Sequence, residues 1–140
     1  MNIAEYIPSD FYNLLAINNS VHDDPEPSKE FRESIRTADK VWVIRDIGAI
    51  TVGFLISTFK DNVPYVYNIS VHKDWQGIGF GSVLLDYFDK YYEQFPVLWL
   101  DVDVNNPAQT LYFRKGYRVA NVVQDFYGEQ KHALSMVKVR

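Results

Sequence analysis

The sequence predicts an α+β fold in which helices flank a mixed sheet, and three observations support this fold class. Residues 41–59 contain two apolar runs joined at residues 47–49, as in an antiparallel hairpin. Residues 63–72 are expected to form a further strand, which leads through a glycine-rich turn into an amphipathic helix. Two strand-like stretches close the chain around residues 128–131. The expected order is β-α-α-β-β-β-α-β-α-β-β, in a single domain that spans residues 1–140.

The first third of the chain predicts a short strand and two helices. Residues 2–7 are expected to form the strand. Ser9 or Asp10 can cap the helix that follows, because four apolar side chains recur at helical spacing after them: Phe11, Leu14, Leu15 and Ile17. Residues 22–40 are polar and acidic and contain two prolines, which predicts a loop followed by a surface helix.

The second half of the chain predicts two more helices and three more strands. The helix after the glycine-rich turn is expected to end near residues 94–96, and its apolar face comprises Val83, Leu84, Leu85, Phe88, Tyr91 and Tyr92. Residues 97–104 predict a strand with Leu98, Leu100 and Val102 on one face and Trp99, Asp101 and Asp103 on the other. Residues 105–116 open with asparagine and proline and end at glycine, which predicts a helix. Residues 117–127 and 132–140 are expected to form the closing strand pair.

Composition indicates a globular protein whose mild acidity suits a cationic or amine-bearing small partner better than a polyanion. Hydrophobic residues make up 47% of the chain and aromatic residues 16%, which is typical of a packed core. The absence of cysteine excludes disulfides and thiolate zinc sites and fits a reducing compartment. The chain contains no run of about 18 apolar residues, so no membrane span is expected. The N-terminus does not resemble a signal peptide. We therefore expect a cytoplasmic protein that binds no membrane. The net charge of −4 and the scattered lysines and arginines argue against nucleic acid.

The turn "WQGIGFGSVLL", residues 75–85, concentrates three glycines within five positions before a helix. Free backbone N–H groups at a helix N-terminus make an anion site. A Walker A loop would need lysine after the last glycine, but Ser82 and Val83 follow Gly81. A Rossmann fingerprint would need a third glycine where Ser82 stands. An ordinary glycine-rich turn and the Gln/Arg-x-x-Gly-x-Gly/Ala loop of acyl-coenzyme A transferases remain, and Gln76, Gly79 and Gly81 fit the latter.

Two separate stretches resemble the GNAT superfamily of N-acetyltransferases. "NISVHKDWQGIGFGSVLL" resembles the strand, loop and helix of its signature, with Val71 at the apolar strand position. "NNPAQTLYFRKGY" resembles a later helix of the family, and the two motifs stand in the family's order. The resemblance implies a mostly antiparallel sheet. It also implies an enzyme that transfers the acetyl group of acetyl-CoA to a primary amine by direct attack in a ternary complex.

The resemblance also implies which residues act. Tyr112 would be the general acid that protonates the departing thiolate, although it could also be a core aromatic. Backbone groups of a splayed strand would meet the thioester and the pantetheine, at Ile69, Ser70 and Val71. The loop would hold the diphosphate through Gln76, Gly77, Ile78, Gly79, Phe80, Gly81 and Ser82. Either Asn105 or Asn106 would touch the cofactor, unless it serves only as a helix cap.

The general base is less obvious, because Tyr67 stands where many family members carry a glutamate on the strand before the loop. The run "LWLD" is similar to the Leu-Trp-Leu-Glu of protein N-terminal acetyltransferases and makes Asp101 the candidate base, acting through a water. A relay through Tyr65 and Tyr67, or a merely solvated Asp101, are the alternatives. The three histidines, His22, His72 and His132, have no ligand spacing, so no metal site is expected.

The acceptor amine stays open at this point. The closing hairpin "VVQDFYGEQKHALSM" is similar to that of ribosomal-protein alanine N-acetyltransferases, with Phe126 and Tyr127 at the aromatic pair, but His132 replaces their acid. A protein N-terminus or a small amine, such as a polyamine or aminoglycoside, could be the acceptor of a monomer or homodimer. A non-catalytic acyl-CoA-binding module and an interaction domain without cofactor are the alternative functions.

Overall fold

The structure is a computed structural model that describes residues 2–140. Its elements follow the predicted order. The strands are β1 (Asn2–Glu5), β2 (Lys40–Arg45), β3 (Thr51–Lys60), β4 (Val63–Val71), β5 (Val97–Asp103), β6 (Arg118–Val123) and β7 (Ala133–Val139). The helices are α1 (Phe11–Val21), α2 (Ser28–Arg36), α3 (Phe80–Tyr91) and α4 (Gln109–Arg114). Across the described residues, no helix is long and apolar enough to cross a membrane.

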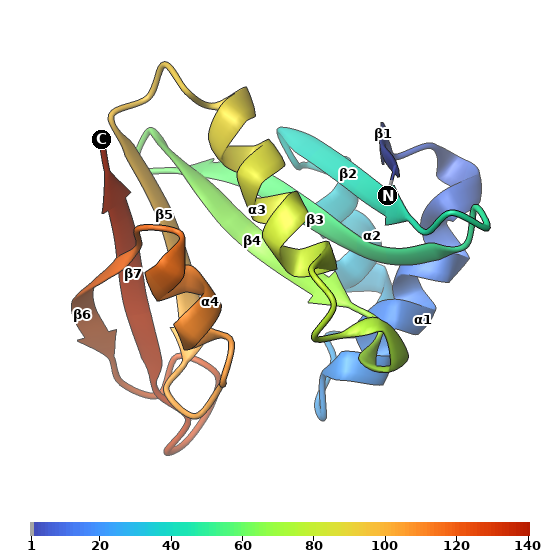
Figure 1. Cartoon of the computed structure of the whole chain (residues 1–140). Helices are drawn as coiled ribbons and strands as arrows, with labels where there is room; N and C mark the ends of the chain where they lie inside the picture. Colours follow the sequence, from blue (N-terminus) through green and yellow to red (C-terminus); the bar gives the residue numbers. More distant parts are fainter. Residues whose placement is uncertain (1) are drawn as a thin grey trace.

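The seven strands form one sheet in the order β1-β2-β3-β4-β5-β7-β6, which confirms the predicted mixed and mostly antiparallel architecture. Among the described strands, only β4 and β5 pair in parallel. Helix α3 covers one face and α1 and α2 cover the other (Figure 1). The core under α3 includes Leu84, Leu85 and Phe88 from its predicted apolar face, and α1 buries Leu14 and Ile17 in the second core.

One predicted helix is shorter than its sequence pattern. Residues 105–116 were expected to form it, but α4 begins only at Gln109. The asparagine and proline that were expected to start the helix stabilise turns instead: the Asn106 side chain accepts a hydrogen bond from the Ala108 N–H at 2.8 Å. Asparagine side chains favour such local bonds over helix interiors, so the segment before α4 lies against the neighbouring strand end as a loop.

Strands β4 and β5 separate soon after they meet. Their ladder contains only the pairs Tyr65–Trp99 and Val66–Leu100, and the two strands diverge beyond it (Figure 1). The predicted splay is therefore present and begins at Tyr67, before the residues at which it was expected. After this point the backbone groups of β4 have no partner strand on that side within the described part of the chain.

A β-bulge sets which β4 side chains face each core. In the β3–β4 ladder Ile56 pairs with Asn68 but Ser57 pairs with Val66, so Tyr67 is an extra residue. The extra residue reverses the alternation of side chains along β4. As a result, Ile69 packs toward α3, and Asn68 instead donates to the Asn18 side chain of α1 at 2.8 Å.

Gly53 in β3 marks the tightest packing of strands in this region. A Cβ there would lie 2.9 Å from the Ser70 carbonyl oxygen and 3.1 Å from Ile44 Cγ2. We expect Gly53→Ala to lower the free energy of unfolding by about 1–3 kcal/mol, because β2 and β4 cannot both move away. Gly48→Ala is the matched control in the β2–β3 turn, where the nearest atom is a side-chain oxygen at 3.4 Å. Denaturant unfolding of both variants tests this, and equal losses would contradict it.

Candidate active site

A cavity of about 710 Å³ opens where β4 leaves β5, between the N-terminus of α3 and α4. Most of the residues expected to hold the cofactor line it: Ile69, Ser70, Val71, Gln76, Gly77, Gly79, Phe80, Gly81, Ser82 and Asn106. Tyr112 lines it as well. Two expected residues do not line it. Ile78 is 61% exposed on the outside of the loop, and Asn105 lies outside the cavity wall.

The glycine-rich loop has a conformation that requires glycine. Gly77 and Gly79 have φ angles of 80° and 105°, in the left-handed region that side chains disfavour. Gln76 closes the loop by donating from Nε2 to the Val71 carbonyl at 2.9 Å. Gly79 is also the N-cap of α3 and, without a side chain, leaves the first N–H groups of the helix uncapped. The loop therefore presents free backbone donors at the positive end of a helix, which suits a diphosphate.

The two candidate asparagines differ in position. Asn106 lines the cavity while its side-chain oxygen caps the turn before α4. Asn105 donates its backbone N–H to the Asp103 carboxylate at 2.8 Å. Of the two, Asn106 is the one whose surroundings fit a cofactor contact. The hydrogen bond by which it caps the turn does not exclude that contact.

Tyr112 lies at the inner wall of the cavity, on α4. Its side chain is almost fully buried, and burial raises the pKa of its phenol to about 12. The phenol therefore stays protonated at neutral pH, as a proton donor must. Tyr112 belongs to the core under α3 and also lines the cavity. A role in core packing is therefore compatible with a role as proton donor.

Asp101 lies on β5 just after Leu100, the last β5 residue that pairs with β4. Its side chain is only 2% exposed, so the alternative that it is a solvated strand residue is wrong. The Tyr65 hydroxyl donates to its Oδ2 at 2.6 Å. Trp99 Nε1 lies 3.3 Å from its Oδ1, and Lys60 Nζ lies 3.6 Å from its Oδ2.

Two tyrosines of β4 face the same side of the sheet as Asp101. Burial, reinforced by the Asp101 charge, raises the pKa of Tyr65 far above its usual value. Burial also raises the pKa of Tyr67 to about 12, and Glu26, which accepts its hydrogen bond at 3.1 Å, adds to the shift. Both phenols are therefore neutral at physiological pH. Tyr65 contacts the candidate base directly, whereas Tyr67 turns away toward the α1–α2 loop.

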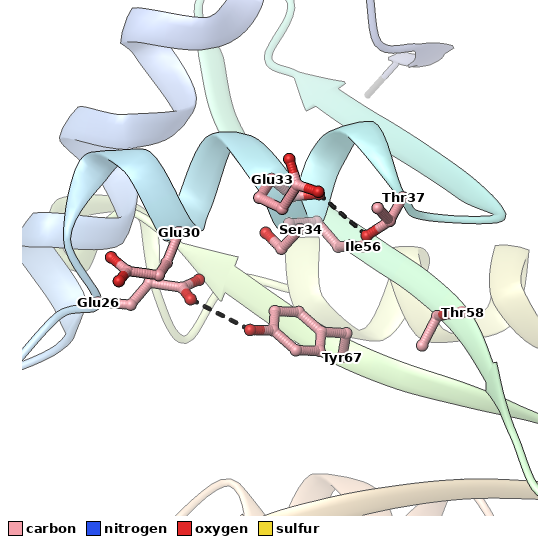
Figure 2. Close-up of a pocket in the computed structure, with 8 residues that line it drawn as sticks. All are labelled: Glu26, Glu30, Glu33, Ser34, Thr37, Ile56, Thr58 and Tyr67. Atoms are coloured by element: carbon pink, nitrogen blue, oxygen red, sulfur yellow. Dashed lines mark hydrogen bonds between the residues drawn. The ribbon is translucent and has the colours of Figure 1, made fainter.

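A second cavity, of about 390 Å³, lies on this side of the sheet. Figure 2 shows the side chains that line it. Glu26 from the α1–α2 loop and Glu30 and Glu33 from α2 line it, and Tyr67 lies opposite them. Burial raises the pKa of Glu26, and the neighbouring Glu30 charge adds to this. Glu33 is ion-paired with Arg36, so the charge of this acidic groove comes from Glu26 and Glu30.

A polar network that the sequence did not predict joins α1 to β4 beside the cofactor cavity. His22 Nε2 lies 3.3 Å from the Ser70 hydroxyl, which in turn donates to the Asn68 side chain at 2.7 Å. Burial lowers the pKa of His22, so its ring is neutral at physiological pH. No periodicity or motif links these positions, because the end of α1 and the middle of β4 meet only in the folded chain.

The other two histidines sit in local turns. His72 Nδ1 accepts from the Asp74 N–H, and His132 Nδ1 accepts from the Asp125 N–H. Within residues 2–140, no group of three or more His, Cys, Asp or Glu side chains is arranged to hold a metal ion.

Comparison with known proteins identifies relatives over most of the chain. Residues 37–119 match the Acetyltransferase (GNAT) domain family. An uncharacterized N-acetyltransferase of Methanocaldococcus jannaschii is 26% identical, over 99% of this chain and 91% of that protein. The ribosomal protein bS18-alanine N-acetyltransferase of Haemophilus influenzae is 30% identical, over 54% of this chain and 53% of its own length.

Solved structures share the fold along the whole chain. The ribosomal-protein-S18-alanine N-acetyltransferase of Escherichia coli superposes with a TM-score of 0.87 at 23% identity, over 99% of this chain and 92% of that one. At this identity the likeness establishes the fold alone.

Proposed function

The chain belongs to the GNAT acetyltransferase family, and we propose that it transfers the acetyl group of acetyl-CoA directly to a primary amine. One observation carries the proposal: a cavity with free backbone donors opens at the point where β4 and β5 part. A protonated phenol lines this cavity, and a buried carboxylate lies on the other face of the sheet, directly after the last β4–β5 pair. Asp101 follows the last β4–β5 pair, and Tyr112 lines the cavity.

The residues of the cavity fit coenzyme A. The uncapped N-terminus of α3 and the left-handed glycines suit its diphosphate, and the unpaired edge of β4 suits the amides of its pantetheine arm. We propose that Gln76–Ser82 hold the diphosphate and that Ile69–Val71 offer backbone N–H groups to the thioester carbonyl. Bound acetyl-CoA would supply the activated acetyl group, and every other part of the chemistry falls to side chains of this chain.

We assign the base role to Asp101 and the acid role to Tyr112. Acceptor amines are protonated near neutral pH, so a base must take a proton before the nitrogen can attack. Asp101 is ordered by the Tyr65 hydroxyl and reaches the acceptor through that hydroxyl or a water. Tyr112, with a pKa near 12, is a proton source for the departing thiolate.

The acceptor we propose is the N-terminus of a basic peptide. The carboxylates of Glu26 and Glu30 in the acidic groove favour positively charged acceptors. The relatives from H. influenzae and E. coli, whose names refer to alanine N-acetylation of a ribosomal protein, support an N-terminal amine. A short peptide with lysine or arginine after its first residue satisfies both observations.

An acceptor screen with acetyl-CoA tests the proposed function. The acceptors are basic and acidic peptides with free N-termini, a lysine peptide with a blocked N-terminus, spermidine and an aminoglycoside, and released thiol is measured. We expect the basic peptide with a free N-terminus to give the highest kcat/KM. Binding of acetyl-CoA without thiol release from any acceptor would favour the non-catalytic acyl-CoA-binding module. Absence of acetyl-CoA binding would contradict the cofactor assignment itself.

A further inference from the structure

Lys60, the last residue of β3, places its ammonium group among three aromatic rings beside the candidate base. Its Nζ lies 4.6 Å from the ring centroid of Trp99, 4.8 Å from that of Tyr65 and 5.6 Å from that of Phe126. The same atom lies 3.6 Å from Asp101 Oδ2. Aromatic faces within about 6 Å attract a cation. We call the site formed by the rings of Tyr65, Trp99 and Phe126 and the carboxylate of Asp101 the cation cage.

The walls of the cation cage are held by contacts that do not involve Lys60. The Tyr65 hydroxyl donates to Asp101, and its ring packs edge-on against Trp99 with centroids 5.3 Å apart. Trp99 Nε1 donates to the Ser135 hydroxyl at 2.7 Å. Phe126 packs edge-on against Tyr127 in the β6–β7 loop. The Tyr65, Trp99 and Asp101 walls are therefore preorganised by β4, β5 and β7. The β6–β7 loop supplies the Phe126 wall, and β3 supplies the cation.

Lys60 itself is held weakly. Its side chain is 42% exposed, against 2% for Asp101, and within the described chain its ammonium makes no hydrogen bond with another side chain or with the backbone. It precedes the β3–β4 turn, where Asp61 and Asn62 both have positive φ angles. Ion pairs and cation–π contacts at exposed positions contribute little, and a flexible lysine loses entropy when it stays in one place. A second cation can therefore replace it.

We propose that the cation cage is a binding subsite for a positively charged group of the acceptor, and that the Lys60 ammonium fills it until the acceptor displaces it. That the ligand of the cage is the acceptor rests on the proposed function. That the cage binds cations is independent of it. Asp101 is itself one wall of the cage, so a bound ammonium pairs with the carboxylate that we propose as the base. Acceptors without positive charge would leave Lys60 in place and compete poorly.

Cation binding to the full chain tests the cage without any acetyl transfer. The probe is n-butylammonium, with n-butanol as its neutral counterpart, followed through the indole N–H resonance of Trp99, which Trp99→Phe identifies. We expect Lys60→Met, which keeps the apolar stem but loses the charge, to bind the ammonium at least about fivefold more tightly than the wild type. Lys60→Arg keeps a competing cation in the cage, so we expect this variant to bind n-butylammonium with the affinity of the wild type.

Equal or weaker ammonium binding by Lys60→Met would overturn the proposal and make Lys60 a permanent partner of Asp101. Equal binding of butanol and butylammonium would overturn it too. Thermal melting checks that the variants fold, and Lys60→Gln serves as a second neutral variant. In the acceptor screen, Lys60→Met is expected to lower the KM for cationic acceptors. If no variant turns over acetyl-CoA but the cage still prefers the cation, the proposed function fails while the subsite stands.

Discussion

Tyr112→Phe is expected to reduce turnover about 10²- to 10⁴-fold, the usual contribution of a general acid. The substitution removes one hydroxyl from a buried ring and leaves the ring's packing in the α3-side core intact. A thiolate whose conjugate acid has a pKa near 8.5 leaves faster when a donor protonates it, and without the phenol only water remains. Because the diphosphate loop and β4 are untouched, acetyl-CoA affinity is expected to stay unchanged. Thiol-release kinetics and calorimetric binding measure the two quantities separately.

Tyr117→Phe is the matched control for this prediction. Tyr117 is as deeply buried as Tyr112, and the centroids of the two rings lie 6.4 Å apart. The Tyr117 hydroxyl has no hydrogen-bond partner among residues 2–140. Removing an unsatisfied buried hydroxyl leaves stability equal or raises it. We therefore expect Tyr117→Phe to turn over like the wild type. Full activity in Tyr112→Phe would remove the acid role from that residue.

Asp101→Asn is expected to lower kcat/KM by about 10²- to 10⁴-fold near pH 7. The amide keeps the shape of the side chain and can still accept the Tyr65 hydrogen bond, but it cannot take a proton. The defect should shrink as the pH rises above about 8, where an α-amine is already neutral without a base. Profiles of kcat/KM between pH 6.5 and 9.5 measure this convergence.

Asp103→Asn provides the control on the same face of β5. The Asp103 carboxylate accepts the Asn105 N–H and, among the described residues, forms no hydrogen bond with Tyr65 and no ion pair with Lys60. We expect its profile to follow that of the wild type. A constant defect of Asp101→Asn at every pH would mean that the carboxylate positions neighbouring groups and is not the base.

The elements of the fold were predictable because local patterns determine them. Alternation along β5 places Leu100 in the core and Asp101 on the opposite face, as the structure has it. The bulge at Tyr67 was not predictable, because it depends on the register of β4 against β3. The start of α4 was misjudged because Asn106 caps a turn rather than the helix.

The candidate site was predictable where it follows a contiguous motif. The glycine-rich loop and Tyr112 belong to such motifs, and both line the cavity. Lys60 and His22 belong to none. Their partners, Asp101 and Ser70, lie on other strands, so only the assembled sheet brings them together. Burial of Asp101 likewise depends on Tyr65 and Trp99 closing over it.

Initial rates of thiol release with acetyl-CoA and acceptor varied together test the central claim of direct transfer between two bound substrates. The chain contains no cysteine, the residue most suited to carry an acetyl group as a thioester. We predict reciprocal plots that intersect, as a ternary complex requires. Parallel plots, which arise when the enzyme itself is acetylated before the acceptor binds, would contradict the account.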